Sequence, residues 1–310
     1  MKIVFLNKHQ ESETRGVETF LVELASRLSS NNDIEIISKI NYFKLLTKPF
    51  NLIVPTNGRG QVVLIRLISW LRGKKMLISG HSGIGLDDRL NLYAFPNTFV
   101  ALSTKAKDWA KKTNPFVQVE KIPNGIDIKK FSKKGQKIEI GLPGPIILSV
   151  AALTEQKRLE LAIGAVSKLK KGSLLIVGSG SEEEKLKSLA EKLIPGRFKI
   201  MAFPYKDMPK VYRSVDLFTY PSVPWESFGI VLLEAMASGL GVVVTNDPIR
   251  TEIVGNAGIM VDPTNTNEYT SALQTALDTN WGNKPRKQAT KFDWNIIACK
   301  YEQLFKKLLK

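Results

Sequence analysis

The sequence predicts an α/β protein of two domains, each built around a parallel β-sheet that is buried on both faces. Its 310 residues are too many for one ordinary domain and suit two of about 100 to 200 residues each. Short runs rich in Val, Ile, Leu and Phe alternate with segments of helical spacing, which is typical of parallel sheets covered by helices. A segment rich in Lys, Gly and Pro, from about residue 132 to residue 145, separates two such series.

In the first series, the apolar run Ile3–Leu6 is expected to form the first strand. A helix is expected from Val17 to about Leu28, because its apolar residues follow helical spacing. Further strands are predicted at 34–37, 52–54, 76–79, 99–102 and 116–122, with helices near 61–71 and 103–113.

The second series follows the linker. Strands are predicted at 146–150, 174–177, 198–201, 217–220, 241–244 and 258–261, with helices starting near Lys157, Ser181, Asp207, Gly229 and Asn267. A last helix, from Trp294 to Leu309, follows a polar stretch and is expected to pack back toward the first domain. The expected divisions are therefore 1–138, 139–292 and a returning helix at 293–310.

Composition favours a soluble, cytoplasmic protein. Hydrophobic residues make up 43% and charged residues 24% of the chain, the balance of a globular protein with a core. No run reaches the roughly 18 apolar residues of a membrane span, and the apolar start is too short for a signal peptide. The single cysteine, Cys299, forms no internal disulfide and fits a reducing compartment.

The positive charge is concentrated in the first half. Residues 1–140 carry +11 of the net +16, so an anionic partner such as a membrane surface or a phosphorylated acceptor is one interpretation, and a merely basic surface is the other. Nucleic acid is not expected, because no helix gathers Lys and Arg on one face between aromatic residues, and no zinc or RNA-binding signature is present.

One helical segment bears on the membrane question. Residues 59–75 form an apolar stretch with basic residues and a tryptophan toward its end. Such a helix could lie on an anionic membrane, which would place the protein at the inner face and favour a lipid-linked acceptor. A helix packed against the first sheet with basic ends is the alternative.

The segment from Pro221 to Gly239 carries the main functional signal. A strand is expected to end near Tyr220, and a helix to start about Phe228 or Gly229 with free backbone N–H groups. Such a helix start binds anions, and glycine at its first position lets a phosphate oxygen approach the backbone closely.

Two carboxylates, Glu226 and Glu234, lie in this segment with seven residues between them. A carboxylate beside a diphosphate repels it, so sugar hydroxyls are the natural partners. We expect Glu226 to accept hydrogen bonds from a hexose and Glu234 to reach a nucleotide ribose. A solvated loop glutamate and a salt-bridged helix glutamate are the alternative.

This segment resembles the E-x7-E motif of the retaining nucleotide-sugar glycosyltransferases of family four. Other segments match that family in order: 15–18, 81–83, 101–103, 122–127, 156–158, 176–180, 216–218, 251–254 and 257–263. The resemblance covers nearly the whole chain. It implies the GT-B fold, in which two Rossmann-like doubly wound parallel-sheet domains face each other across a cleft. It also implies transfer of a hexose from a UDP- or GDP-linked donor to a hydroxyl acceptor with retention, in polysaccharide or glycolipid biosynthesis. The basic first half and the segment 59–75 add the possibility that this acceptor is phosphorylated or lipid-linked.

The resemblance also implies roles for basic residues. Lys157 matches the lysine that contacts the donor diphosphate, where negative charge builds as the nucleotide leaves, and Arg158 is a candidate second cation. Two exposed basic residues opening a helix are the alternative. The family usually has an arginine where Ala152 stands. Replacement by Arg158, weaker donor binding and a different donor are all consistent with this departure.

Other residues are placed by the same resemblance. Gly16 resembles the second glycine of a pair near the donor phosphates, with Arg15 in place of the first. His81 matches a histidine near the hexose and is expected to orient the sugar or the backbone rather than to act as a base; a structural histidine is the alternative. Phe203 falls near the nucleotide base. Donor binding extends over Ser227, Phe228, Gly229, Ile230 and Val231.

The expected catalytic residues are therefore Glu226, His81 and Lys157. No metal ion or cofactor is expected, because the sequence has no Asp-x-Asp, histidine pair or cysteine cluster. A phosphorylase or an epimerase on the same fold is an alternative enzyme. A non-catalytic nucleotide-sugar-binding partner is a third possibility, suggested by Ala152 and the short first domain.

Overall fold

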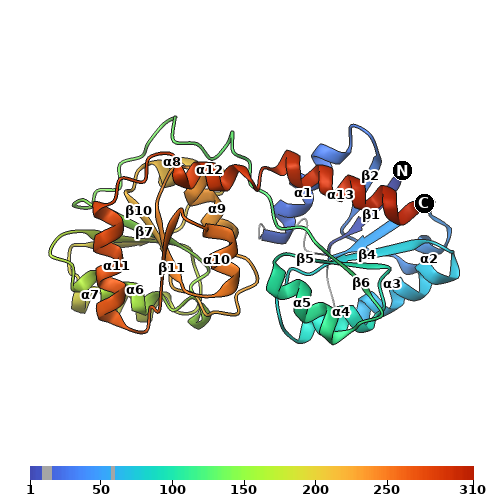
Figure 1. Cartoon of the computed structure of the whole chain (residues 1–310), viewed down its shortest axis with the longest axis horizontal. Helices are drawn as coiled ribbons and strands as arrows, with labels where there is room; N and C mark the ends of the chain where they lie inside the picture. Colours follow the sequence, from blue (N-terminus) through green and yellow to red (C-terminus); the bar gives the residue numbers. More distant parts are fainter. Residues whose placement is uncertain (9–15, 57–59) are drawn as a thin grey trace. The chain divides into compact units, whose positions relative to one another are not determined.

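The computed structural model describes residues 1–8, 16–56 and 60–310. The chain forms two compact units (Figure 1). The first consists of Met1–Gly125 with Trp294–Lys310, and the second is Ile126–Asp293.

The first boundary lies at Gly125, whereas the sequence suggested residue 138. The guanidinium of Arg286 explains the difference. It donates hydrogen bonds to the carbonyl oxygens of Ile128 at 2.9 Å and Phe131 at 3.1 Å. These bonds attach the segment just before the linker to the second unit.

The first unit is built on a parallel sheet. Among the described residues its six strands lie in the order β2-β1-β3-β4-β5-β6. They are β1 (Lys2–Leu6), β2 (Asp33–Ile37), β3 (Leu52–Pro55), β4 (Lys75–Ser79), β5 (Thr98–Ala101) and β6 (Gln118–Lys121). In β1, Ile3 and Phe5 join one core cluster and Val4 and Leu6 another. The sheet is thus buried on both faces, as the apolar runs predicted.

Helices cover both faces of this sheet (Figure 1). On one face α1 (Gly16–Leu28) packs with α13 (Trp294–Leu309). The other face is covered by α2 (Tyr42–Thr47), α3 (Gly60–Leu71), α4 (Leu86–Tyr93) and α5 (Thr104–Thr113). Both α2 and α4 are missing from the prediction, because α2 is short and α4 buries Asp88 and Asn91 beside a single leucine.

The second unit repeats this architecture. Within the residues described, its sheet has the order β12-β11-β10-β7-β8-β9, and all neighbours are parallel. The strands are β7 (Ile146–Val150), β8 (Ser173–Val177), β9 (Phe198–Met201), β10 (Leu217–Tyr220), β11 (Val242–Thr245) and β12 (Gly258–Val261). The chain proceeds to one side after β7 and to the other after β10, so this adjacent pair forms the topological switch point, where ligands of such sheets bind.

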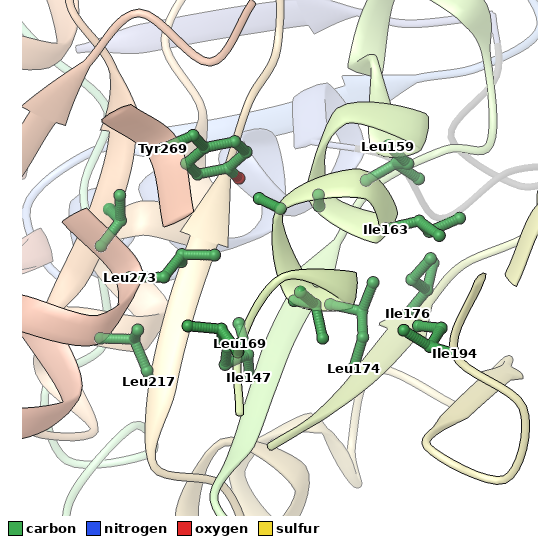
Figure 2. Close-up of a cluster of buried hydrophobic side chains, with 14 of the residues drawn as sticks. Ile147, Leu159, Ile163, Leu169, Leu174, Ile176, Ile194, Leu217, Tyr269 and Leu273 are labelled. Carbon is green, nitrogen blue, oxygen red and sulfur yellow. The ribbon is translucent and has the colours of Figure 1, made fainter. Parts of the chain in front are cut away.

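The helices of the second unit include two that the sequence did not predict, α10 and α12. The full set is η1 (Glu155–Lys157), α6 (Leu159–Ser167), α7 (Glu183–Leu193), α8 (Met208–Arg213), α9 (Ile230–Ala237), α10 (Pro248–Val254), α11 (Thr266–Asp278) and α12 (Lys284–Thr290). Figure 2 shows side chains of this core, with Ile163 of α6 near Ile176 and with Tyr269 and Leu273 of α11 on the opposite side of the view. This core holds the strands from which the site loops emerge.

Candidate active site

Two loops emerge at the switch point of the second sheet. The loop after β7 carries Lys157 and Arg158, and the loop after β10 carries Glu226 and leads into α9. Because β7 and β10 are adjacent and parallel, both loops leave the sheet at the carboxyl ends of its strands. The backbone N–H of Val223 donates to the carbonyl oxygen of Gln156 at 3.0 Å and links them.

Arg158 holds the loop after β10 in place. Its Nε donates to the carbonyl oxygen of Pro221 at 2.8 Å, and its Nη2 donates to that of Ser222 at 2.7 Å and to Oγ1 of Thr245 at 3.2 Å. Its backbone has φ 48° and ψ 39°, a left-handed conformation that is uncommon outside glycine. The guanidinium therefore positions the loop, and contact with a donor stays a prediction.

Lys157 and Glu226 form an ion pair, although they lie 69 residues apart in the sequence. The ammonium also donates to the hydroxyl of Tyr220 at 3.2 Å. Burial alone would lower the pKa of Lys157, but its electrostatic interactions with Tyr220 and Glu226 outweigh burial and raise that pKa above its ordinary value. Lys157 is therefore a fixed positive charge, as a diphosphate-binding residue requires.

The sequence did not single out Tyr220 or Arg250. Arg250 is fully buried, pairs with Asp247 at 2.8 Å, and donates to Oγ of Ser222 at 2.6 Å and to the carbonyl oxygen of Val223 at 3.2 Å. These hydrogen bonds hold the first residues of the loop after β10. Tyr220 could have been found as a polar aromatic residue ending a buried strand directly before the motif, whereas nothing local marks Arg250 as buried.

The start of α9 has the expected glycine geometry. Gly229 has φ 85°, a region that L-residues rarely adopt. A side chain there would begin 3.4 Å from the ring of Tyr220 and from Leu232. Phe228 is buried and its ring lies 6.3 Å from that of Phe292, and its contact with a donor stays a prediction. The other predicted residues of this start are partly exposed: Ser227, Ile230 and Val231.

Glu234 lies on the buried side of α9, with only 3% of its surface exposed. The hydroxyl of Tyr212 donates to its Oε2 at 2.8 Å. Burial raises the pKa of Glu234 to about 7, although hydrogen bonds from Tyr212 and Tyr205 and the charge of Lys130 act in the opposite direction. The carboxyl is therefore poised between its two protonation states near neutral pH. Its contact with a ribose stays a prediction.

Phe203 lies apart from the switch point. It is half-buried between β9 and α8, and β9 is the edge strand, two strands away from β7. At about 4.8 Å between neighbouring strands, that displacement is roughly 10 Å along the sheet. Its proposed contact with the nucleotide base is untested.

His81 follows β4 in the first unit. Its ring meets the ring of Phe20 edge-on, with centroids 4.4 Å apart. Among the residues described, no group hydrogen-bonds its buried Nε2. Burial lowers the pKa of His81 to about 4, so the imidazole is neutral at physiological pH. A neutral ring fits the orienting role that the sequence suggested.

Asp88 holds the loop that carries His81. Its buried carboxyl accepts hydrogen bonds from the backbone of Ser82 and Gly83 and from Nδ2 of Asn91 at 2.9 Å. Burial raises the pKa of Asp88 to about 7. The sequence did not predict this residue, because α4 itself was missed.

Gly16 begins α1 and is exposed, with open space where a side chain would stand. Arg15, expected beside it, lies outside the described residues. Lys157, Arg158 and Glu226 are thus brought together in the second unit, whereas Gly16 and His81 belong to the first. Within the described ranges, no three His, Cys, Asp or Glu side chains are grouped to hold a metal ion.

Known proteins resemble this chain in sequence. Residues 130–292 match the family model of the glycosyl transferases group 1. A phosphatidyl-myo-inositol mannosyltransferase of Mycolicibacterium smegmatis is 26% identical over 220 residues, which is 66% of this chain and 56% of the relative. An uncharacterized glycosyltransferase of Methanocaldococcus jannaschii is 34% identical over 175 residues, or 52% of this chain and 44% of the relative. The chain thus spans about half the length of these curated relatives.

The fold has counterparts among solved structures. The crystal structure of Anabaena HepE in complex with UDP aligns with a TM-score of 0.83 at 18% identity, covering 99% of this chain and 100% of that chain. Two six-stranded parallel sheets, as seen in the described residues, confirm the predicted fold class. Because the family model covers more than half of the chain, this protein belongs to the group 1 glycosyl transferases and has the GT-B fold.

Proposed function

We propose that this protein transfers a hexose from a UDP- or GDP-linked donor to a hydroxyl acceptor with retention of the anomeric configuration. The observation that carries the proposal is the pairing of Lys157 with Glu226 and Tyr220 near the glycine start of α9. A nucleoside diphosphate gains negative charge as it leaves, and fixed positive groups stabilise that charge. Lys157 and the N–H groups at the start of α9 supply them.

The ion pair suggests how donor binding prepares Glu226. The Lys157 ammonium has three N–H donors, and Glu226 and Tyr220 engage two of them. A bound pyrophosphate competes for the same charge and releases part of the hydrogen-bonding capacity of Glu226. That carboxylate then accepts hydrogen bonds from hexose hydroxyls and places the anomeric carbon for transfer.

The descriptions of related proteins support a choice of donor and of acceptor. The solved HepE complex contains UDP, which favours a uridine donor here. The mycobacterial relative is named for mannosyl transfer to phosphatidyl-myo-inositol, which favours a lipid-linked acceptor. We place transfer at the inner face of a membrane, in glycolipid or polysaccharide synthesis.

We further propose that transfer needs no metal ion, because Lys157 and the start of α9 provide the positive charge at the diphosphate. Chelation of metal ions with EDTA should then leave the rate of hexose transfer unchanged. A rate that falls on chelation and recovers with Mg²⁺ or Mn²⁺ would show that these groups do not suffice.

Titration calorimetry with UDP and GDP tests the site directly. We expect one nucleotide to bind and Lys157→Met to abolish detectable binding, while Lys170→Met, an exposed lysine of the same unit, leaves affinity unchanged. Nuclear magnetic resonance of the product reports retention, and it also distinguishes an epimerase, which leaves the sugar on the nucleotide. If neither nucleotide binds the wild-type protein, the proposed function fails.

A further inference from the structure

Helices α2 and α3 of the first unit carry an exposed apolar surface on the side away from the sheet. One face of α3 packs in the core through Val62, Ile65 and Ile68. Its other face is exposed, and 67% of the surface of Trp70 is accessible there. On α2, 84% of the surface of Phe43 is accessible. We call this the α2–α3 surface, and its large apolar members are Phe43, Leu46, Val63, Leu64, Leu67, Trp70 and Leu71.

The geometry of α3 is unusual for a surface helix. Successive residues turn by about 100°, so the exposed apolar residues fall in one arc opposite the buried ones. A helix that is apolar all round is normally covered on every side, yet only one side of α3 is covered. An exposed patch of this kind marks an interaction surface.

The two helices form one supported surface. Nη1 of Arg72, just after α3, donates to the carbonyl oxygens of Leu45 at 2.9 Å and Lys48 at 2.6 Å. The same guanidinium lies 4.7 Å from the centre of the Phe50 ring. Arg72 therefore fixes α2 against α3.

The charge along this stretch of the chain is mainly positive, although Lys48 at the end of α2 pairs with Glu35 of β2 at 2.7 Å. Residues 36–86 contain eight Lys and Arg residues and no Asp or Glu. Lys39 and Lys44 are exposed, and Lys74 and Lys75, between the end of α3 and the start of β4, are partly exposed. A second copy of this chain docking face to face would bring these charges against one another. An anionic partner is favoured.

We infer that the α2–α3 surface docks onto an anionic lipid bilayer, with α3 lying in the plane of the membrane. Apolar side chains enter the boundary of the acyl chains while basic residues meet anionic headgroups, as in interfacial helices. Spanning is not the mode of contact, since 12 residues of helix reach about 18 Å and a bilayer core is about 30 Å thick. Every helix among the described residues falls short of what crossing a bilayer requires.

This inference rests on the proposed function only for its lipid-linked acceptor, which a docked enzyme would meet at the membrane. The contact itself needs neither donor nor acceptor. It can therefore be measured without any transfer reaction.

The test is sedimentation with vesicles of phosphatidylcholine alone or mixed with phosphatidylglycerol. We expect the wild-type chain to pellet only with the anionic vesicles. Leu67→Ser/Trp70→Ser should weaken partitioning by about tenfold for each side chain removed. Ile296→Ser is the matched control, because this exposed residue lies on α13, over the opposite face of the sheet, and its partitioning should equal that of the wild type.

A second readout uses Trp70 itself. Brominated lipids should quench the part of the fluorescence that Trp70→Phe removes, and thermal unfolding should show that all variants fold. Equal recovery of the wild type in the supernatant with both vesicle types would overturn the inference. So would a dimer that Leu67→Ser/Trp70→Ser dissociates without any vesicle binding. Vesicle binding in a protein that binds no nucleotide would leave this inference standing and refute the proposed function alone.

Discussion

Replacing Glu234 with glutamine should make the second unit more stable at alkaline pH. The difference between a pKa of about 7 in the folded protein and the ordinary value of 4.5 corresponds to about 3 kcal/mol at 1.36 kcal/mol per pH unit. Below pH 4.5 the carboxyl is protonated in both states and contributes no difference. As pH rises toward 7 the unfolded chain releases the proton first, so the wild type loses stability, and the loss is complete above pH 7.

The assay is thermal unfolding of wild type and Glu234→Gln between pH 5 and pH 8. Glutamine keeps an oxygen to accept the Tyr212 hydroxyl but never ionises. For a domain of 150 to 250 residues, about 3 kcal/mol corresponds to roughly 6 to 12 °C in melting temperature. We expect the melting temperature of the variant to rise relative to the wild type by about this amount between the two pH values.

Tyr212→Phe is the control, because it removes a hydrogen bond that stabilises the Glu234 carboxylate. Its melting temperature should fall more steeply with pH than that of the wild type. Nucleotide affinity provides a functional readout: if the ribose binds the carboxylate, affinity should increase as pH rises through 7. If the melting temperatures of the wild type and of Glu234→Gln change by the same amount between pH 5 and pH 8, the reasoning is refuted.

Three further substitutions test residues that hold the site loops in place. Gly229→Ala should destabilise the protein by about 1 to 2 kcal/mol, because its φ of 85° disfavours a side chain. Gly164→Ala, inside α6 with open space around it, should stabilise the protein instead. Equal melting temperatures for the two variants would contradict this prediction. Arg250→Met leaves Asp247 buried without its partner and should cost about 3 to 5 kcal/mol in chemical unfolding; a loss under 1 kcal/mol would mean that the pair supports little. Asp88→Ala frees the loop after β4 and should lower turnover by up to about 100-fold with unchanged nucleotide affinity, whereas a change in affinity alone would assign it another role.

Much of the fold could be read from local patterns. Each predicted strand was found close to its expected range, because parallel strands buried on both faces form continuous apolar runs. The long amphipathic helices were predicted for a similar reason. The helices α2, α4, α10 and α12 were missed, since each spans eight residues or fewer and carries too few apolar repeats to show a period.

The site was only partly predictable. Gly229 and the start of α9 follow from a strand, a loop and a glycine in succession, all of them local features. Arg158 was predicted as a candidate second cation for the donor, which stays a prediction, and its guanidinium holds the backbone of the loop after β10. Which partner a long cationic side chain chooses depends on the loop beside it, and the sequence does not state which loop that is.

The sequence by itself determined the two parallel-sheet domains and the segment that carries the motif, because periodicity and turn chemistry act over a few residues. Only the tertiary structure decided that Lys157 pairs with Glu226, that Arg250 is buried and that the pKa of Glu234 lies near 7. These properties arise from strand order, which places β7 beside β10 and joins loops 69 residues apart. Burial and electrostatics are set by neighbours in space, and the order of strands in a sheet is what supplies those neighbours.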